Sequence, residues 1–258
     1  MDLRLKFNED VINYDKMRPA YVNELFQEVI QFTNLDHSKK ALEIGIGTGQ
    51  ATLPFLNTGC MVTAIELGES LATFSAEKFS GFANFNVINQ DFESVTLDNN
   101  HYDLVYSATA FHWIPQEIGY TKVYELLRNG GVLALFWNRP YPATEDDLHN
   151  AIQKAYDKYR PLFEKPILAH RHSDENCMEM VNTIKRYGFI DVSFKLYHRT
   201  RTFDAQSYIS LLNTYSDHRA LKDDQRILLE EEIIEAINHY GGLMNIQDRI
   251  ELFLARKP

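Results

Sequence analysis

Short apolar runs alternate with amphipathic segments along the first half of the chain. Strands that are apolar throughout and separated by helices are typical of parallel strands covered on both faces. The pattern therefore predicts an α/β fold with a doubly wound, mainly parallel sheet. Five runs have the length of buried strands, at 39–47, 60–67, 84–91, 102–108 and 132–138. Helical spacing of apolar residues fills the segments 20–32, 51–57, 70–79 and 118–131.

The second half of the chain alternates less regularly. Residues 190–203 and 249–258 read as two further strands, which fit as an antiparallel C-terminal edge and complete a seven-stranded sheet. Residues 1–258 are expected to form a single domain, with helical insertions at 143–172 and 204–240 that cap the active site. Extra core layers are the alternative for these helices. The helix over 118–131 is expected to end on a glycine cap at Gly130 or Gly131.

Composition and charge indicate which classes of molecule the protein is expected to bind and where it is expected to act. The 258 residues carry a formal net charge of -10, which disfavours binding to phosphate backbones and so predicts no nucleic-acid partner. No apolar stretch approaches the roughly 18 residues of a membrane span. Two distant cysteines without CxxC spacing suit a reducing cytosol, so the prediction is a cytoplasmic protein acting on a small molecule. No metal site is predicted, and His170 and His172 are expected in a solvated loop.

A glycine loop follows the first predicted strand. The stretch LEIGIGTGQ, residues 42–50, brings Gly45, Gly47 and Gly49 to the point where the strand must turn sharply. Glycine permits backbone conformations that other residues resist, and lets a ligand approach the main chain closely. Gln50 stands where the dinucleotide-binding pattern needs its third glycine, so the loop departs from that pattern.

Acidic residues close the next two strands. Glu66 ends the second strand, where a carboxylate can accept both hydroxyls of a ribose. Asp91 ends the third strand and is followed by Phe92, so a carboxylate and an aromatic ring are available for an adenine. Each acid alone is more simply a solvated strand end. The glycine loop and both acids at successive strand ends predict a nucleoside-containing cofactor.

These residues resemble those of class I S-adenosylmethionine-dependent methyltransferases over nearly the whole chain. The resemblance rests on residues 43–49, on Glu66, on residues 90–92 and on the turn LLRNGGVLALF. The stretches FNEDVINYDKMRPAY, AFHWI and YISLLNTYSDHRAL further resemble the small-molecule branch of type 11 and trans-aconitate methyltransferase-like proteins. The resemblance implies a Rossmann-like methyltransferase fold and methyl transfer from S-adenosylmethionine, with S-adenosylhomocysteine as product. The implied acceptor is a small molecule, with a carboxylate or hydroxyl favoured.

The resemblance also implies the residues of the cofactor site. Glu43 and the three loop glycines would hold the methionine part, Glu66 the ribose, and Asp91 with Phe92 the adenine. Leu67 is a further expected cofactor-binding residue. Tyr14 and Arg18 would close over the cofactor, because the planar guanidinium of Arg18 can pair with its carboxylate. An ordinary surface arginine is the alternative for Arg18. Ser107 and Ala108 would lie beside the sulfur.

The stretch SATAFHWIP, residues 107–115, is the candidate acceptor site. Phe111 and Trp113 are expected to wall the acceptor pocket, with Tyr215 and Arg219 as further contacts from the second half. His112 has the intrinsic properties of a general base, and a hydrogen-bonded structural role is its alternative. Only a hydroxyl, amine or carbon acid would need that base, since a carboxylate is already ionised.

Two other functions are compatible with parts of this pattern. A nicotinamide-dependent oxidoreductase would also bind its cofactor at such a sheet, although Gln50 and the pair Asp91–Phe92 count against it. A non-catalytic S-adenosylmethionine-binding protein would keep the same cofactor residues. The sequence predicts no oligomeric state.

Overall fold

The computed structural model describes residues 10–142, 146–159 and 174–258, which fall into two compact units. The sheet unit contains residues 19–138, 174–197 and 250–258, and the helical unit contains the described parts of 1–18, 139–173 and 198–249. His170, His172 and part of the predicted insertion 143–172 lie outside the described residues. The other predicted insertion, 204–240, belongs to the helical unit. Its placement over the active site stays a prediction.

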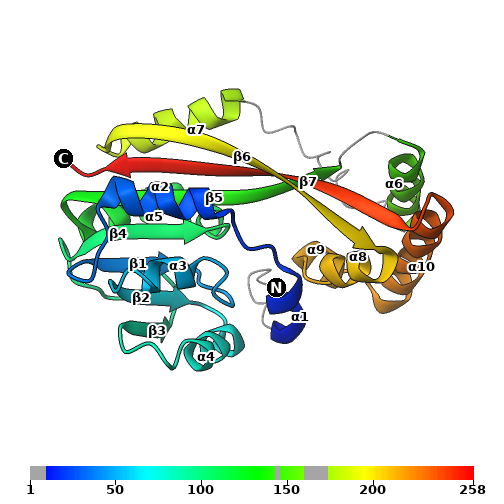
Figure 1. Ribbon diagram of the computed structural model, residues 1–258, viewed down its shortest axis with the longest axis horizontal. Helices are drawn as coiled ribbons and strands as arrows, with labels where there is room; N and C mark the ends of the chain where they lie inside the picture. Colours follow the sequence, from blue (N-terminus) through cyan, green and yellow to red (C-terminus); the bar gives the residue numbers. More distant parts are fainter. Residues whose placement is uncertain (1–9, 143–145, 160–173) are drawn as a thin grey trace. The chain divides into compact units, whose positions relative to one another are not determined.

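The described strands form one seven-stranded sheet in the order β3-β2-β1-β4-β5-β7-β6. The pairs β1–β2, β1–β4, β2–β3 and β4–β5 are parallel. Strand β7 lies between β5 and β6 and is antiparallel to both in Figure 1. This arrangement confirms the mainly parallel sheet with an antiparallel C-terminal strand. The strands are β1 (Lys40–Ile44), β2 (Met61–Glu66), β3 (Phe85–Asn89), β4 (Tyr102–Ala108), β5 (Leu127–Pro142), β6 (Ile190–Asp204) and β7 (Leu243–Arg256).

Two apolar layers cover the faces of the sheet in the sheet unit. Ala41 of β1 packs in a cluster with side chains of α2 (Asn23–Thr33) and α3 (Thr52–Leu56). Leu42 and Ile44 of the same strand belong to a second cluster with α5 (Gln116–Leu126) and α7 (Asp174–Arg186). Neighbouring strand residues point to opposite faces, so both faces of β1 are buried. The remaining helix of this unit, α4 (Glu69–Lys78), follows β2. The burial of both faces of β1 confirms the doubly wound architecture.

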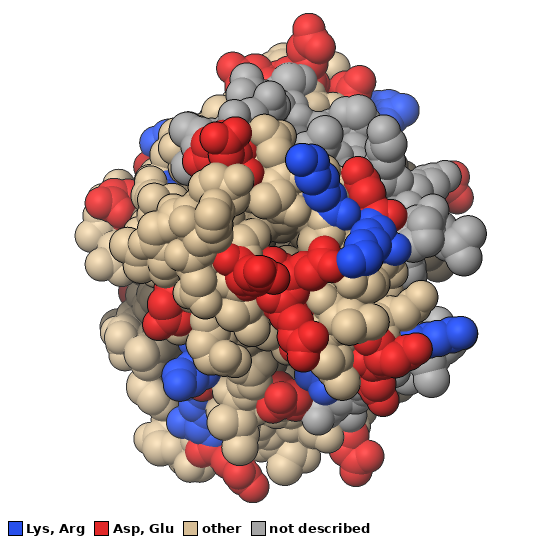
Figure 2. All heavy atoms as spheres, turned by 90° about the vertical axis from the view of Figure 1, so that its right-hand side faces the viewer, with Lys and Arg blue, Asp and Glu red and all other residues tan. Residues whose placement is uncertain are grey.

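The helical unit has a third apolar cluster of its own. Its helices are α1 (Val11–Met17), α6 (Asp147–Tyr159), α8 (Ala205–Leu212), α9 (Ser216–Arg219) and α10 (Asp223–His239). The fully buried Asp248 accepts hydrogen bonds from Arg199 and Arg201, so its charge is compensated within the unit. Figure 2 faces the side of the molecule on which α10 is drawn, and acidic side chains gather near its centre.

The expected glycine cap of α5 is wrong. The helix ends at Leu126, and Leu127 is already extended, with φ -69° and ψ 138°. Leu127 pairs with Tyr102 of β4, while Gly130 donates from its backbone N–H to the carbonyl of Lys257. Strand pairing therefore takes residues 127–131 out of the helix, and the positive φ of Gly130 serves the strand.

No helix among the described residues is long and apolar enough to cross a membrane.

Candidate active site

The glycine loop after β1 turns with three positive φ angles. Gly45, Gly47 and Gly49 have φ values of 71°, 58° and 81°, in the left-handed region that favours glycine. Space is equally restrictive, because a methyl group at Gly49 would lie 2.3 Å from the ring of Phe79. A methyl group at Gly45 would lie 2.5 Å from the Cβ of Ala110. The loop after β4 therefore lies directly against the glycine loop.

Glu43 lies near the end of β1, just before this loop. Its side chain is fully buried, and Oε2 accepts hydrogen bonds from Thr52 Oγ1 at 2.7 Å and Tyr106 Oη at 2.8 Å. Oε1 is buried without a hydrogen-bond partner among the described residues. Burial raises the pKa of Glu43 to about 7, against the lowering effect of the two hydroxyl donors. Such an oxygen is a ready acceptor for a cationic N–H group.

Glu66 connects the loop to the end of β2. Its Oε2 accepts from the backbone N–H of Gly47 at 2.8 Å, and its Oε1 accepts from that of Gly68 at 2.9 Å. Burial raises the pKa of Glu66, while these backbone donors act against the rise. Each carboxylate oxygen has a second lone pair, so the side chain can still accept from two hydroxyl groups. The half-buried Leu67 follows directly, and its carbonyl accepts from Asn89.

Asp91 at the end of β3 has a different environment. Its carboxylate accepts from the backbone N–H of Ser94 at 3.1 Å and from Ser94 Oγ at 2.6 Å. The serine hydroxyl is the main reason that the pKa of Asp91 falls to about 2. Phe92 is buried in the sheet unit, with the ammonium of Lys122 5.2 Å from its ring centre. Asp91 is thus ionised at any physiological pH.

The predicted acceptor stretch divides between core and surface. Ser107 is buried, and its hydroxyl donates to the carbonyl of Ile44 at 2.8 Å, which ties β4 to β1. Ala108 is half-buried at the end of β4. Phe111 is buried against Tyr120, at a ring separation of 4.9 Å, so it packs in the core. Trp113 is half-buried in the short 3-10 helix η2 (Phe111–Trp113).

His112 is exposed and hydrogen-bonded to the next strand. Trp137 of β5 donates from its indole Nε1–H to His112 Nδ1 at 3.2 Å. Trp137 itself is buried, and its ring meets Phe253 edge-to-face at 5.9 Å. The imidazole ring of His112 also lies 5.1 Å from that of Trp113. A rigid core residue therefore orients the exposed histidine.

Sequence patterns missed several polar residues near these groups. Thr52 and Tyr106 look like ordinary helix and strand residues, yet their hydroxyls hold Glu43. Asn138 follows Trp137, and both polar atoms of its side chain are buried without a hydrogen-bond partner among the described residues. Its backbone N–H donates to Thr109 Oγ1, which also bonds the hydroxyl of Tyr21 at 2.6 Å. A polar residue at the end of an apolar strand was the available signal for Asn138.

The remaining predicted residues belong to the helical unit. The guanidinium of Arg18 lies 5.0 Å from the ring centre of Tyr14 and 4.6 Å from that of Tyr215. It also donates to the carbonyl of Thr214 at 2.8 Å. Arg219 donates to the carbonyl of Asn213 at 3.2 Å. Arg18, Tyr14 and Tyr215 thus form one cluster, and the predicted closure of Arg18 and Tyr14 over a cofactor stays a prediction.

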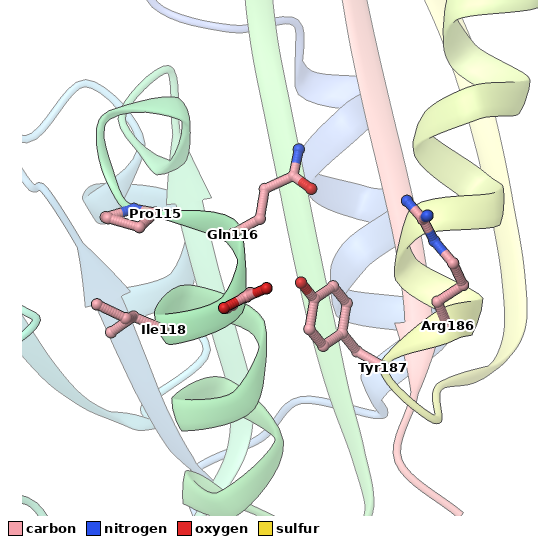
Figure 3. Close-up of a pocket in the computed structure, with 6 residues that line it drawn as sticks. Pro115, Gln116, Ile118, Arg186 and Tyr187 are labelled. Carbon is pink, nitrogen blue, oxygen red and sulfur yellow. The ribbon is translucent and has the colours of Figure 1, made fainter.

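A pocket of about 540 Å³ lies elsewhere in the sheet unit (Figure 3). It is open between the start of α5 and the end of α7, and Tyr187 on its wall stacks on Tyr120 at 4.8 Å. No predicted cofactor or acceptor residue lines it, so it is no part of the candidate active site. The lining residues are Pro115, Gln116, Glu117, Ile118, Arg186 and Tyr187.

Comparison with known proteins finds a methyltransferase domain within the sheet unit. The model of a methyltransferase domain matches residues 42–135, which run from the glycine loop to β5. An uncharacterised methyltransferase of Schizosaccharomyces pombe is 21% identical over 90% of this chain and 86% of its own length. Residues 42–135 are thus a methyltransferase domain, and the chain is an S-adenosylmethionine-dependent methyltransferase.

One further sequence relative and one similar solved structure have names that state a reaction. A malonyl-[acyl-carrier protein] O-methyltransferase of Paenibacillus is 32% identical over 46% of this chain and 45% of its own length. The solved structure of Haemonchus contortus phosphoethanolamine N-methyltransferase 2, in complex with phosphomonomethylethanolamine and S-adenosylhomocysteine, is similar with a TM-score of 0.58. It is 16% identical and is covered over 60% of its length by the whole of this chain, so the likeness concerns the fold.

The cofactor of this methyltransferase is S-adenosylmethionine, and the strand ends fit it. The buried Oε1 of Glu43 has no hydrogen-bond partner in the described part of the chain, and the cofactor carries an ammonium group that can supply one. The Gly45 and Gly49 positions leave no room for a side chain, because Ala110 and Phe79 pack directly against the glycine loop there. Acceptor oxygens of Glu66 complement ribose hydroxyls. The donor and acceptor set therefore matches the group.

Proposed function

We propose that this methyltransferase methylates an oxygen of a small molecule, with a carboxylate or a hydroxyl as the acceptor group. The Paenibacillus relative supports oxygen methylation, since its name states a malonyl-[acyl-carrier protein] O-methyltransferase. The net charge of -10 supports a small soluble acceptor over a nucleic acid. The acceptor would meet the methyl group beside β4, where His112 and Trp113 follow the loop that touches Gly45.

The cofactor-binding residues of this proposal lie at the ends of three adjacent strands. Glu43 would hold the ammonium group, Glu66 the ribose hydroxyls and Asp91 the adenine amino group. The strongest support is the buried oxygen of Glu43 to which no described residue donates a hydrogen bond, because a native fold rarely leaves such an atom without a ligand or water. The hydroxyl groups of Thr52 and Tyr106 would keep this carboxylate in place through their hydrogen bonds to its other oxygen, Oε2.

In this reaction the main role of the protein would be to align the acceptor with the methyl group. The cofactor supplies a sulfonium-bound methyl group that is transferred by in-line displacement. The chain must hold the acceptor oxygen on the far side of that methyl group and keep water out. The buried Ser107 and the core residue Phe111 fix the start of the turn that carries His112 and Trp113. This rigidity suits a group that orients an acceptor.

Two measurements test the proposal. Titration calorimetry is expected to show binding of S-adenosylhomocysteine and no binding of NADH. Incubation with S-adenosylmethionine labelled in the methyl group is then expected to label carboxylic acids or alcohols in a panel that also contains amines. Binding of NADH alone would remove the cofactor assignment. Label on amines only would contradict oxygen methylation while leaving the cofactor site in place.

A further inference from the structure

The hydrogen bond between Trp137 and His112 fixes the proton on the histidine ring. An indole N–H only donates, so His112 Nδ1 must accept it at the observed 3.2 Å. A neutral imidazole whose Nδ1 accepts carries its hydrogen on Nε2. Protonation of Nδ1 would bring two N–H groups face to face. Nε2 of His112 therefore carries the hydrogen and has the character of a donor.

The position of Trp137 makes this a durable arrangement. Its side chain is 3% exposed, and its ring packs edge-to-face on Phe253 in the apolar layer of the sheet unit. A buried indole N–H without a partner is unfavourable, so the bond to His112 is retained. The turn of η2 that carries His112 is closed by a backbone bond, in which the N–H of Trp113 donates to the carbonyl of Ala110.

The loop that carries His112 is also held at the cofactor side. Ala110 touches Gly45 of the glycine loop, and the hydroxyl of Thr109 bonds both the hydroxyl of Tyr21 and the backbone N–H of Asn138. Thr109 has a positive φ of 55°, which non-glycine residues adopt rarely and only where the surroundings enforce it. The turn is therefore fixed between β5 and the proposed methionine site.

We propose that Trp137 is a positioning residue that keeps His112 in the Nε2–H tautomer, so that His112 donates a hydrogen bond to the methyl acceptor and does not act as its general base. The proposal rests on the proposed function for the identity of the group that Nε2–H meets. An acceptor carboxylate suits this donor. In that step the bond between carbon and sulfur breaks with its electron pair on sulfur, the bond between carbon and oxygen forms, and no proton moves.

The tautomer can be measured without any acceptor. Two-bond proton–nitrogen NMR spectra of the protein labelled with 15N-histidine distinguish the two neutral tautomers, and His112→Gln identifies the signals of His112. The wild type is expected to show the Nε2–H form of His112, and Trp137→Phe a larger share of the other tautomer. Trp113→Phe is the matched control, because it removes the neighbouring indole and keeps the bond to Nδ1. A predominant Nδ1–H form in the wild type would overturn the proposal.

Kinetics then separates a donor from a base. The side-chain amide of His112→Gln can donate near the position of Nε2 but cannot accept a proton, whereas His112→Ala does neither. We expect kcat/KM to fall by about 10- to 100-fold in His112→Ala, as for a lost hydrogen bond to a charged group, and by less than about 10-fold in His112→Gln. A base would cost about 100- to 10,000-fold in both variants, which would contradict the proposal.

Trp137→Phe connects the two measurements. We expect it to lower kcat/KM in the wild-type background and to have no further effect in His112→Gln, because the glutamine has no tautomer to select. Affinity for S-adenosylhomocysteine is expected to be unchanged in all these variants, and this affinity also reports that each variant is folded. An equal loss from Trp137→Phe in both backgrounds would assign Trp137 a purely structural role. If no acceptor is methylated by the wild type, the proposed function fails while the NMR result on Trp137 still stands.

Discussion

Glu43 and Asp91 are two carboxylates at the ends of parallel strands, and their surroundings are opposite. Glu43 is fully buried, with one oxygen bound to two hydroxyls and the other without a hydrogen-bond partner among the described residues. Asp91 lies near the surface, and both of its oxygens accept hydrogen bonds from Ser94. Burial raises the pKa of Glu43 to about 7, and the serine hydroxyl helps to lower the pKa of Asp91 to about 2.

The contrast indicates different uses for the same chemical group. A buried acid with an incomplete set of partners is unstable alone and is stabilised by a cation. A surface acid that closes a turn contributes to the fold before any ligand arrives. We therefore propose that Glu43 serves mainly in ligand binding and that Asp91 serves partly in closing the loop after β3. Both can still contact the cofactor, and substitutions separate the two contributions.

The largest expected effect is on the pH dependence of stability. The folded state holds the Glu43 proton up to about pH 7, whereas the unfolded chain releases it near pH 4.5. Stability from this group is therefore present below pH 4.5 and is lost as pH rises to about 7, by about 3 kcal/mol. Glu43→Gln remains uncharged, so its free energy of unfolding should lack this loss in urea titrations between pH 4.5 and 8.

Two control substitutions define that result. Asp91→Asn should leave the pH dependence between pH 4.5 and 8 unchanged, because its contribution is lost only as pH falls through about 2. Asp103→Asn removes another buried carboxylate, at the opposite ends of the strands, where Asp103 accepts from the backbone N–H of Lys40. It should lower stability without affecting the cofactor. Identical pH profiles for the wild type and Glu43→Gln would contradict the assigned environment of Glu43.

The next largest effect is the proton linkage of cofactor binding. An ammonium group beside Oε1 favours the ionised form of Glu43, so binding of S-adenosylhomocysteine near pH 6 should release up to one proton. Calorimetry in buffers with different ionisation enthalpies measures this proton directly. In Glu43→Gln the release should disappear, and the affinity should fall by about 10- to 100-fold, the equivalent of a charge-assisted hydrogen bond. Proton release that persists in the variant would place the ammonium group elsewhere.

Sequence patterns predict structural features that depend on neighbouring residues, and they miss features that depend on tertiary contacts. Apolar runs predicted the parallel strands, because burial on both faces leaves a continuous apolar segment such as Leu133–Phe136. The helix end at Leu126 was missed, since the pairing of Leu127 with Tyr102 is a tertiary contact. The glycine loop and the acids that follow the strands could be predicted for a similar reason, because each is visible within a short stretch of sequence. The Trp137–His112 bond joins residues 25 positions apart on different elements, which a single sequence does not show.

The smallest effect distinguishes the two uses of Asp91. Asp91→Ala removes the turn contact and the proposed adenine contact, whereas Ser94→Ala removes only the hydroxyl that donates to Asp91. Both variants should lose up to about 1 kcal/mol of unfolding free energy. Only Asp91→Ala should weaken binding of S-adenosylhomocysteine, by about 1 kcal/mol or a factor of about 5 in calorimetry. Equal affinities in the two variants would assign Asp91 to the turn alone and leave Glu43 and Glu66 as the acids of the cofactor site.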